Sequence, residues 1–334
     1  LVGSEMCIRD SNMILKQAEA AEFATRFAQI AENVDQAILG KGHQVRLVLA
    51  AFLAGGHVLL EDAPGTGKTA LARALAASVD ATHSRIQFTP DMLPTDITGV
   101  TVYDQKTKEW DFHAGPIFAN IVLADEINRA SPKTQSALLE VMEERQVSVD
   151  GVIHPVESPF LVIATQNPVE QAGTYKLPEA QLDRFLIKIS LGYPDQETAI
   201  KILSGAAQPD LSKDLKPVVE SDEIATWEQL GLRNYVDEQI TRYVQQLAEA
   251  TRLDDAVNLG VSTRATIGMM RMAKVWAASQ GRHYVLPDDI KTLAVPVWAH
   301  RIIMDADALF EGATAQSVVE RALNEVPPPV DSQA

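Results

Sequence analysis

The stretch LLEDAPGTGKTALA, residues 59–72, decides the fold of this chain. Its central part, DAPGTGKT at 62–69, matches the phosphate-binding pattern GxxxxGK[ST] except at the first position, where Asp62 stands instead of glycine. The apolar run HVLLE at 57–61 precedes the loop, and KTALARALAASV at 68–79 has a helical composition. A strand, a glycine loop and a helix in this order are the context that such a loop requires, so the stretch predicts a phosphate-binding loop in an α/β fold.

The loop contains the components that hold a phosphate, namely converging backbone N–H groups, a helix N-terminus and a cation. Gly65 and Gly67 allow unusual dihedral angles and a close approach of the backbone. Lys68 can bridge the β- and γ-phosphates, and the Thr69 hydroxyl can ligate Mg²⁺. Asp62 lies where the strand ends, so it is compatible with binding if its carboxylate points away from the nucleotide. The alternative is a tight strand-to-helix turn that binds nothing. The predicted nucleotide-binding residues of the loop are Ala63, Pro64, Gly65, Thr66, Gly67, Lys68, Thr69 and Ala70.

Two adjacent carboxylates follow a second apolar run. IVLADE at 121–126 predicts a buried strand that delivers Asp125 and Glu126 at its carboxyl end, where ligands bind in open α/β sheets. Asp125 would bind the nucleotide and, with Thr69, hold Mg²⁺ directly or through water. Glu126 would polarise the attacking water. An acidic strand-to-loop junction is the alternative, but the pair follows the phosphate loop in the order expected for nucleotide hydrolysis.

Other short apolar runs predict the rest of a sheet. They are rich in Ile, Val, Leu and Phe, and they are separated by helical or turn-rich segments. Near-continuous apolar strands are typical of a parallel sheet that is covered on both faces. The runs are SRIQF at 84–88, ANIVLA at 119–124, FLVIATQ at 160–166 and FLIKIS at 185–190.

Two pairs of short alternating runs predict β-hairpins that protrude from the sheet. VTVY at 100–103 pairs with EWDF at 109–112 around a polar loop. VSV at 147–149 pairs with VIHPV at 152–156 around Asp150-Gly151, a dipeptide that favours tight hairpin turns.

The strand pattern ends near residue 195, and helical periodicity follows in segments such as 237–253, 262–280 and 287–302. Residues 204–223 have little periodicity and are predicted to form a surface loop. We therefore divide the chain into a translated adapter or cloning scar at 1–12, a core at 13–194 with two hairpin inserts, a helical domain at 195–326 and a C-terminal tail at 327–334.

Composition limits the possible functions. The 334 residues are enough for about two domains, and 46% are hydrophobic, as expected of a globular protein. A net charge of -16 without a basic run argues against a nucleic-acid partner. One cysteine, Cys7, excludes an internal disulfide and fits a reducing cytoplasm. The most apolar stretch, at 47–60, is too short to cross a bilayer.

Several longer runs resemble the AAA+ ATPases of the MoxR family. The resemblance implies a P-loop AAA+ fold, an α/β three-layer αβα core with a parallel sheet, followed by a smaller all-helical lid domain. The residues that carry it are PGTGKTALARALA at 64–76, RIQFTPDMLPTDITG at 85–99, GPIFANIVLADEINRASPKTQSALLEVMEERQVSVDG at 115–151, ATQNPVEQAGTYKLPEAQLDRF at 164–185 and GVSTRA at 260–265.

The resemblance also implies roles for three further residues. Asn167 takes the sensor 1 place, where a polar side chain helps to orient the water that attacks the γ-phosphate. Arg264 takes the sensor 2 place and reaches the nucleotide from the helical domain. Arg184 takes the place of an arginine finger, which acts on the γ-phosphate of a neighbouring subunit. A turn at Asn167, a surface position for Arg264 and an ion pair of Arg184 with a carboxylate are the alternatives. Arg129 and Arg145 are the other candidates for the finger.

The implied function is ATP hydrolysis with Mg²⁺ in a homo-oligomeric, hexameric ring that remodels or matures a protein client. The resemblance further implies a chaperone-like role with a partner that carries a von Willebrand factor A domain, often in metal-cofactor insertion. Three alternatives are the ATPase subunit of a magnesium or cobalt chelatase, a nucleic-acid motor or loader, and a nucleotide-binding scaffold without turnover. The acidic balance argues against the motor, and Lys68, Asp125 and Glu126 together argue against the scaffold.

Overall fold

The computed structural model describes residues 14–63, 65–167, 174–204 and 211–329. The predicted scar at 1–12, Pro64 of the loop and the end of the predicted tail lie outside the described residues. The chain forms two compact units that are interleaved along the sequence. The core unit consists of residues 29–185 and 189–225, and the helical unit consists of residues 1–28, 186–188 and 226–334. The domain boundary near residue 194 stays a prediction.

A five-stranded sheet contributes four whole strands to the core unit, and of its fifth strand, β9, only Ile189 is assigned to that unit. Its strand order is β2-β5-β8-β1-β9, and the pairs β2–β5, β5–β8 and β1–β8 are all parallel. Non-sequential neighbours require crossover connections, so this order confirms the α/β fold that the apolar runs predict. The strands are β1 (Val58–Glu61), β2 (His83–Gln87), β5 (Ile121–Asp125), β8 (Leu161–Gln166) and β9 (Ile187–Ile189).

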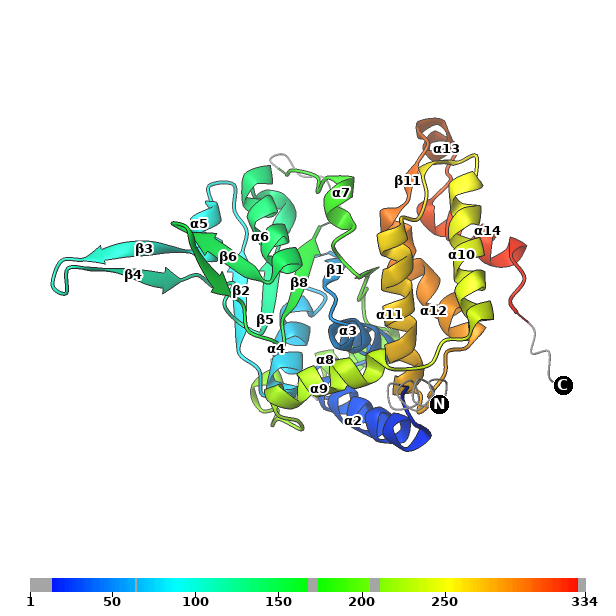
Figure 1. The fold of residues 1–334 in the computed structure, drawn as a ribbon, viewed down its shortest axis with the longest axis horizontal. Coiled ribbons are helices and arrows are strands. Elements are labelled where there is room, and N and C mark those ends of the chain that lie inside the picture. The colour runs from blue at the N-terminus through cyan, green and yellow to red at the C-terminus, as the bar shows by residue number, and fades with distance from the viewer. Residues whose placement is uncertain (1–13, 64, 168–173, 205–210, 330–334) are drawn as a thin grey trace, which may run out of the picture. The chain divides into compact units, whose positions relative to one another are not determined.

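Helices pack on both faces of this sheet. Val122 and Ala124 of β5 and Val162 of β8 lie in one apolar cluster with Leu138 and Leu139 of α6 (Pro132–Glu144). Alternate strand residues point to the opposite face, and α4 (Lys68–Ser78), which contacts β5 and β2, contributes no described residue to that cluster. The sheet is therefore the middle layer of an αβα arrangement (Figure 1). The remaining helices of this unit are α3 (Gly42–Leu53), α5 (Pro94–Thr98), η1 (Ile127–Arg129), α7 (Glu179–Leu182), α8 (Gln196–Leu203) and η2 (Leu211–Lys213), and α2 (Gln17–Asp35) begins in the helical unit and ends in the core unit.

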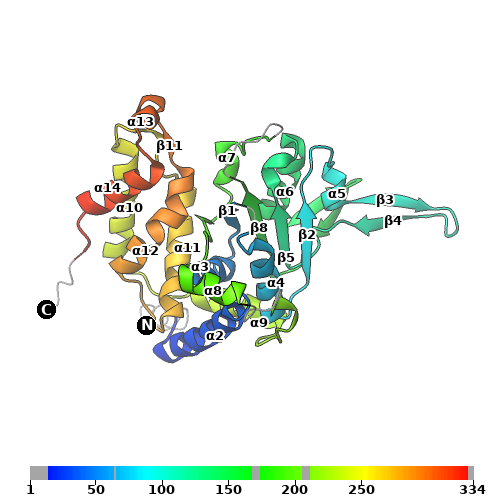
Figure 2. The ribbon, with the colours of Figure 1, turned by 180° about the vertical axis from the view of Figure 1, so that it is seen from behind.

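Both predicted hairpins are present. Strand β3 (Gly99–Asp104) pairs with β4 (Glu109–Ala114), and β6 (Gln146–Val149) pairs with β7 (Val152–Pro155). Figures 1 and 2 show that the β3–β4 hairpin extends away from the sheet.

The base of the β3–β4 hairpin is closely packed. A Cβ on Gly99 would lie 2.3 Å from the backbone oxygen of His113, and one on Gly115 would lie 2.2 Å from that of Ile97. Only glycine fits at these two positions, because both neighbours are backbone atoms.

Asp62 joins the end of β1 to the chain that follows β9. Its carboxylate is buried, and it accepts hydrogen bonds from the Ser190 hydroxyl (2.7 Å), the Leu191 N–H (2.7 Å) and the Gly192 N–H (3.0 Å). These three donors therefore hold the carboxylate. An aspartate at this position is compatible with nucleotide binding if its carboxylate points away from the nucleotide, and the contacts with residues 190–192 meet that condition. Asp62 therefore has a structural role where the loop pattern has glycine.

The helical unit contains α10 (Glu238–Leu253), α11 (Thr263–Ser279), α12 (Pro287–Trp298), α13 (Ala306–Phe310) and α14 (Ala315–Glu325). Helix α9 (Ser221–Leu232) begins inside the segment 204–223, for which the sequence predicts a surface loop. A small antiparallel pair, β10 (Val257–Leu259) and β11 (Ile303–Met304), corrects the expectation of an all-helical domain. Strands of two or three residues are too short to produce a periodic sequence pattern.

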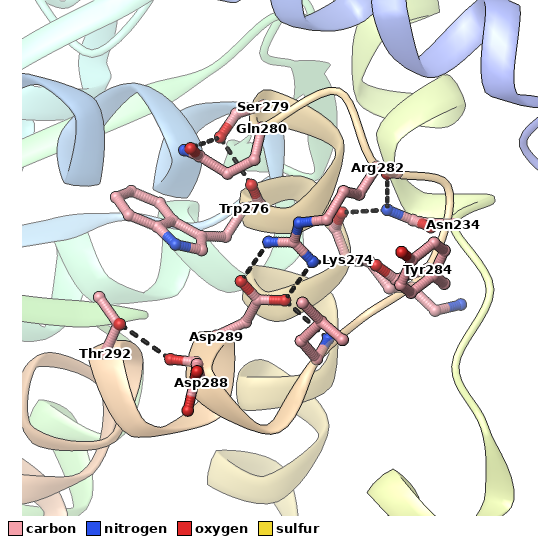
Figure 3. Close-up of polar contacts among 11 residues, drawn as sticks. Asn234, Lys274, Trp276, Ser279, Gln280, Arg282, Tyr284, Asp288, Asp289 and Thr292 are labelled. Carbon is pink, nitrogen blue, oxygen red and sulfur yellow. Dashed lines mark hydrogen bonds and ion pairs between the residues drawn. The ribbon is translucent and has the colours of Figure 1, made fainter. Parts of the chain in front are cut away.

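An ion pair fixes the turn between α11 and α12. Arg282 donates to both carboxylate oxygens of Asp289 at 2.8 and 2.6 Å, and Asp289 also accepts from the Leu286 N–H at the start of α12 (Figure 3). Asn234 donates to the backbone oxygens of Lys274 and Arg282, so the same polar cluster reaches the segment after α9. These buried and bidentate contacts hold three segments together.

Among the helices of the described ranges, none has the length and apolarity needed to cross a membrane.

Substitution of Asp62 tests its structural role. Asp62→Gly restores the loop pattern but leaves the Leu191 and Gly192 N–H groups without their acceptor. We expect it to lower the free energy of unfolding by about 3 kcal/mol, measured by urea denaturation. Ser190→Ala, which removes one of the three donors, should cost about 1 kcal/mol. Unchanged stability of Asp62→Gly would contradict the assignment.

Candidate functional site

A pocket of about 480 Å³ lies at the carboxyl end of the parallel sheet in the core unit. The end of β5, the start of α4 and the edge strand β2 contribute its wall, which is the position at which open α/β sheets bind ligands. Its lining residues are Gly65, Gly67, Lys68, Thr69, Ala70, Arg73, Arg85, Gln87, Asp125 and Glu126.

Two glycines form an open cradle in front of helix α4. Gly65 has a φ of 84° and Gly67 a φ of 92°, angles that favour glycine. Apart from the glycine itself and its two chain neighbours, no described atom lies within 4 Å of where a Cβ would be on either residue, so a group of a ligand can approach the backbone closely. The helix N-terminus behind the cradle favours an anion.

The side chains at the start of α4 complete this part of the site. Lys68 donates from Nζ to the backbone oxygen of Asp62 at 3.0 Å, and Thr66 donates to that of Ala63 at 3.3 Å. Lys68 and Thr69 both line the pocket, in agreement with the loop pattern. Pro64 lies outside the described residues.

Asp125 is the last residue of β5, and both of its carboxylate oxygens are engaged. Oδ1 accepts from the Thr165 hydroxyl at 2.7 Å, and Oδ2 is 2.6 Å from Nη2 of Arg85. The Thr165 oxygen in turn accepts the N–H of Glu126 at 2.9 Å. Thr165 on the neighbouring strand therefore orients both predicted acidic residues.

Glu126 adopts a left-handed backbone conformation, with a φ of 57°. Non-glycine residues with positive φ are uncommon and concentrate at functional sites. Its Oε2 accepts from Nη1 of Arg129 at 3.0 Å and from Nε2 of Gln87 at 3.2 Å. Arg129, one of the alternative finger candidates, is therefore paired with Glu126 in the same chain.

Asn167 directly follows β8, which lies between β5 and β1 in the sheet. Strand β8 therefore lies between β1, which precedes the phosphate loop, and β5, which ends at Asp125. Asn167 is not among the described residues that line the pocket.

The other three predicted arginines are not among the described residues that line the pocket. Arg184 forms an ion pair with Glu143, with 3.0 Å between Nε and Oε2, which matches the alternative of a carboxylate partner. Arg145 ends α6 and donates to the backbone oxygen of Gly55 at 3.2 Å. Arg264 is the second residue of α11 and belongs to the helical unit, whereas the pocket belongs to the core unit.

The sequence analysis missed four polar residues at the site, which are Arg73, Arg85, Gln87 and Thr165. Arg73 lines the pocket, and its charge adds to burial in lowering the pKa of His83. The alternation of Arg85 and Gln87 around buried Ile86 was a usable signal, because it predicts two polar side chains on the face of the strand opposite to Ile86.

The donor set suits a nucleotide with Mg²⁺. Thr69 and Asp125 offer a hydroxyl and a carboxylate oxygen on one pocket, and hard oxygen ligands are those that Mg²⁺ prefers. Across the residues that the structure describes, no three His, Cys, Asp or Glu side chains gather as a dedicated metal cage. A site with one carboxylate is the arrangement in which Mg²⁺ binds together with phosphates.

Comparison with known proteins agrees with this geometry. Residues 57–187 match the ATPase family associated with various cellular activities (AAA), and residues 249–322 match the AAA lid domain. YeaC of Bacillus subtilis is 47% identical over 91% of this chain and 95% of its own length. The chaperone MoxR1 of Mycobacterium tuberculosis is 41% identical over 92% of this chain and 83% of its own length.

A solved structure gives the same result for the fold. A protein of Cytophaga hutchinsonii with 36% identity superposes with a TM-score of 0.87, over 93% of this chain and 97% of that protein. The residues of the pocket, the strand order and these relatives agree, and the chain belongs to the MoxR family of AAA+ ATPases.

Proposed function

We propose that the chain binds ATP with Mg²⁺, hydrolyses it in an oligomeric ring, and uses the resulting change of shape to remodel or mature a protein client. One observation carries the proposal. Lys68 and Thr69, at the start of α4, share a pocket with Asp125 and Glu126, at the end of β5, beside an open glycine cradle.

Each side chain has a role that its position supports. Lys68 would hold the terminal phosphates by charge, and Thr69 and Asp125 would ligate the metal. Glu126 would accept the proton of the attacking water. Mg²⁺, when bound with ATP, would neutralise charge on the phosphate oxygens. Asn167 as sensor 1 and Arg264 as sensor 2 belong to the same proposal, and Arg184 acts from a neighbouring subunit.

The client is proposed to be a protein, and the partner a protein with a von Willebrand factor A domain. The name of the relative MoxR1 supports a chaperone-like role. The net charge of -16 favours a protein over a nucleic acid. Both hairpins carry exposed apolar side chains, among them Trp110, Val152 and Ile153, which offer a surface to a protein.

Removal of the loop cation tests nucleotide binding. Lys68→Ala should weaken ATP binding by roughly 100-fold, because a charge-assisted contact to the phosphates contributes up to about 3 kcal/mol. Isothermal titration calorimetry measures the affinity. Lys106→Ala, in the exposed loop of the β3–β4 hairpin, removes the same charge outside the pocket and should bind ATP normally. Equal affinities of the two variants would refute the assignment of the loop.

Glu126→Gln should bind ATP with Mg²⁺ but hydrolyse it roughly 10²–10⁴-fold more slowly, because the amide cannot accept the proton. Phosphate release measures the rate, and Glu140→Gln on the exposed side of α6 is the matched control. The stalled protein should capture a protein with a von Willebrand factor A domain in ATP and not in ADP. Trp110→Ala in the stalled protein should reduce that capture. Recovery of nucleic acid or of chelatase subunits would overturn the proposal.

A mixture of two inactive variants tests whether Arg184 acts in trans. In rings of Arg184→Ala and Glu126→Gln subunits, some interfaces combine an intact Glu126 with an intact Arg184 of the neighbour. Hydrolysis should therefore recover in the mixture, once subunit exchange is demonstrated by fluorescence. Glu143→Gln separates this role from the ion pair inside the chain, and it should keep most of the activity. No recovery, together with an inactive Glu143→Gln, would assign Arg184 a structural role only.

A further inference from the structure

Arg85 lies at a position of the site that the loop pattern does not describe. It belongs to β2, the strand next to β5, and the register pairs Arg85 with Leu123 and Gln87 with Asp125. Arg85 and Gln87 are two residues apart, so they share one face of this edge strand. Both line the pocket together with Asp125 and Glu126.

The Arg85 guanidinium contacts Oδ2 of Asp125, and the other carboxylate oxygen, Oδ1, accepts a hydrogen bond from Thr165. Nη2 of Arg85 lies 2.6 Å from Oδ2 of Asp125, while Oδ1 accepts from Thr165 at 2.7 Å. The Asp125 side chain is only 13% exposed, whereas that of Arg85 is 47% exposed. A metal ion bound at Oδ2 would lie close to the positive guanidinium, so the two cations would repel each other at this oxygen.

The same guanidinium group reaches the second acidic residue through Gln87. Nη2 of Arg85 donates to Oε1 of Gln87 at 2.7 Å, and Nε2 of Gln87 donates to Glu126 at 3.2 Å. Asp125 and Glu126 are thus connected by a continuous chain of polar contacts on the side of β2. Movement of Arg85 away from Asp125 would therefore also change the contacts of Gln87.

We propose that Arg85 is a positioning residue that competes with Mg²⁺ for Asp125 and so sets how strongly ATP binding depends on Mg²⁺. The inference rests on the proposed function. Without metal, Arg85 neutralises Asp125 and reduces its repulsion of the phosphates. With metal, Arg85 leaves Oδ2, and its half-exposed guanidinium remains on the pocket wall, where it faces the phosphates as a further cation beside Lys68 and Arg73.

Arg85→Gln tests the competition through binding alone, without reference to turnover. The affinity for adenylyl imidodiphosphate is measured by calorimetry in MgCl₂ and in EDTA. The readout is the dissociation constant in EDTA divided by the dissociation constant in MgCl₂. In EDTA, Asp125 without Arg85 should repel the phosphates, so binding should weaken. In MgCl₂, the loss of the competitor for Asp125 and the loss of the Arg85 cation near the phosphates act in opposite directions, so binding should change little. We expect the ratio to rise about tenfold over that of the wild type.

Three further variants make the result specific. Arg85→Met, which keeps most of the aliphatic stem, replaces the glutamine variant if that variant does not fold. Arg85→Lys restores a cation and should return the ratio toward the wild-type value. Arg73→Gln removes a positive charge from the same pocket, and it should weaken binding equally in both buffers and leave the ratio unchanged.

The outcomes separate the two proposals. A wild-type protein that does not bind the nucleotide in MgCl₂ would overturn the proposed function. A wild-type protein that binds, with the same ratio in wild type, Arg85→Gln and Arg85→Met, would overturn the role of Arg85 alone. A change only in thermal stability, with an unchanged ratio, would also assign the ion pair a purely structural role.

Discussion

The hydrogen bonds of the Asp62 carboxylate are the constraint on which the pocket depends. They fix the end of β1 against residues 190–192, so the chain enters the glycine loop from a defined point. Lys68 then bonds to the backbone oxygen of the same residue, and α4 begins there. A glycine at position 62 could not supply this anchor, because it has no side-chain acceptor for the buried N–H groups of the segment after β9.

The electrostatics of the pocket follow from a second arrangement, in which each acidic residue has a cationic partner. Asp125 is paired with Arg85, and Glu126 is paired with Arg129. Carboxylates on adjacent residues repel each other, and the arginines and the Thr165 hydroxyl offset that repulsion at the edge of the sheet. A cation that binds at either carboxylate would therefore meet an arginine that is already there, and the binding free energy would include the loss or rearrangement of that ion pair.

Local sequence patterns predicted the architecture and most of the residues that line the pocket. The glycine loop, the apolar strand before Asp125 and the two hairpins all depend on residues that are close in sequence, and their composition reports directly on local structure. The pairing of Arg85 with Asp125 and the contacts of Asp62 with residues 190–192 depend on strand order, which periodicity does not encode. The strands β10 and β11 were missed because strands of three and two residues are too short to show a periodic pattern. The catalytic roles of Asn167, Arg184 and Arg264 stay predictions.

The close packing at the base of the β3–β4 hairpin has a mechanical consequence. Gly99 and Gly115 approach neighbouring backbone so closely that the base cannot bend independently of α5, which it contacts. Each strand has 6 residues, so the hairpin is an arm roughly 20 Å long. A lever of this length converts a small rotation of α5 into a displacement of several ångströms at the far end of the arm, about 3.5 Å for each 10° of rotation. A motion that begins near the sheet would therefore reach the far end of the arm amplified in distance and reduced in force.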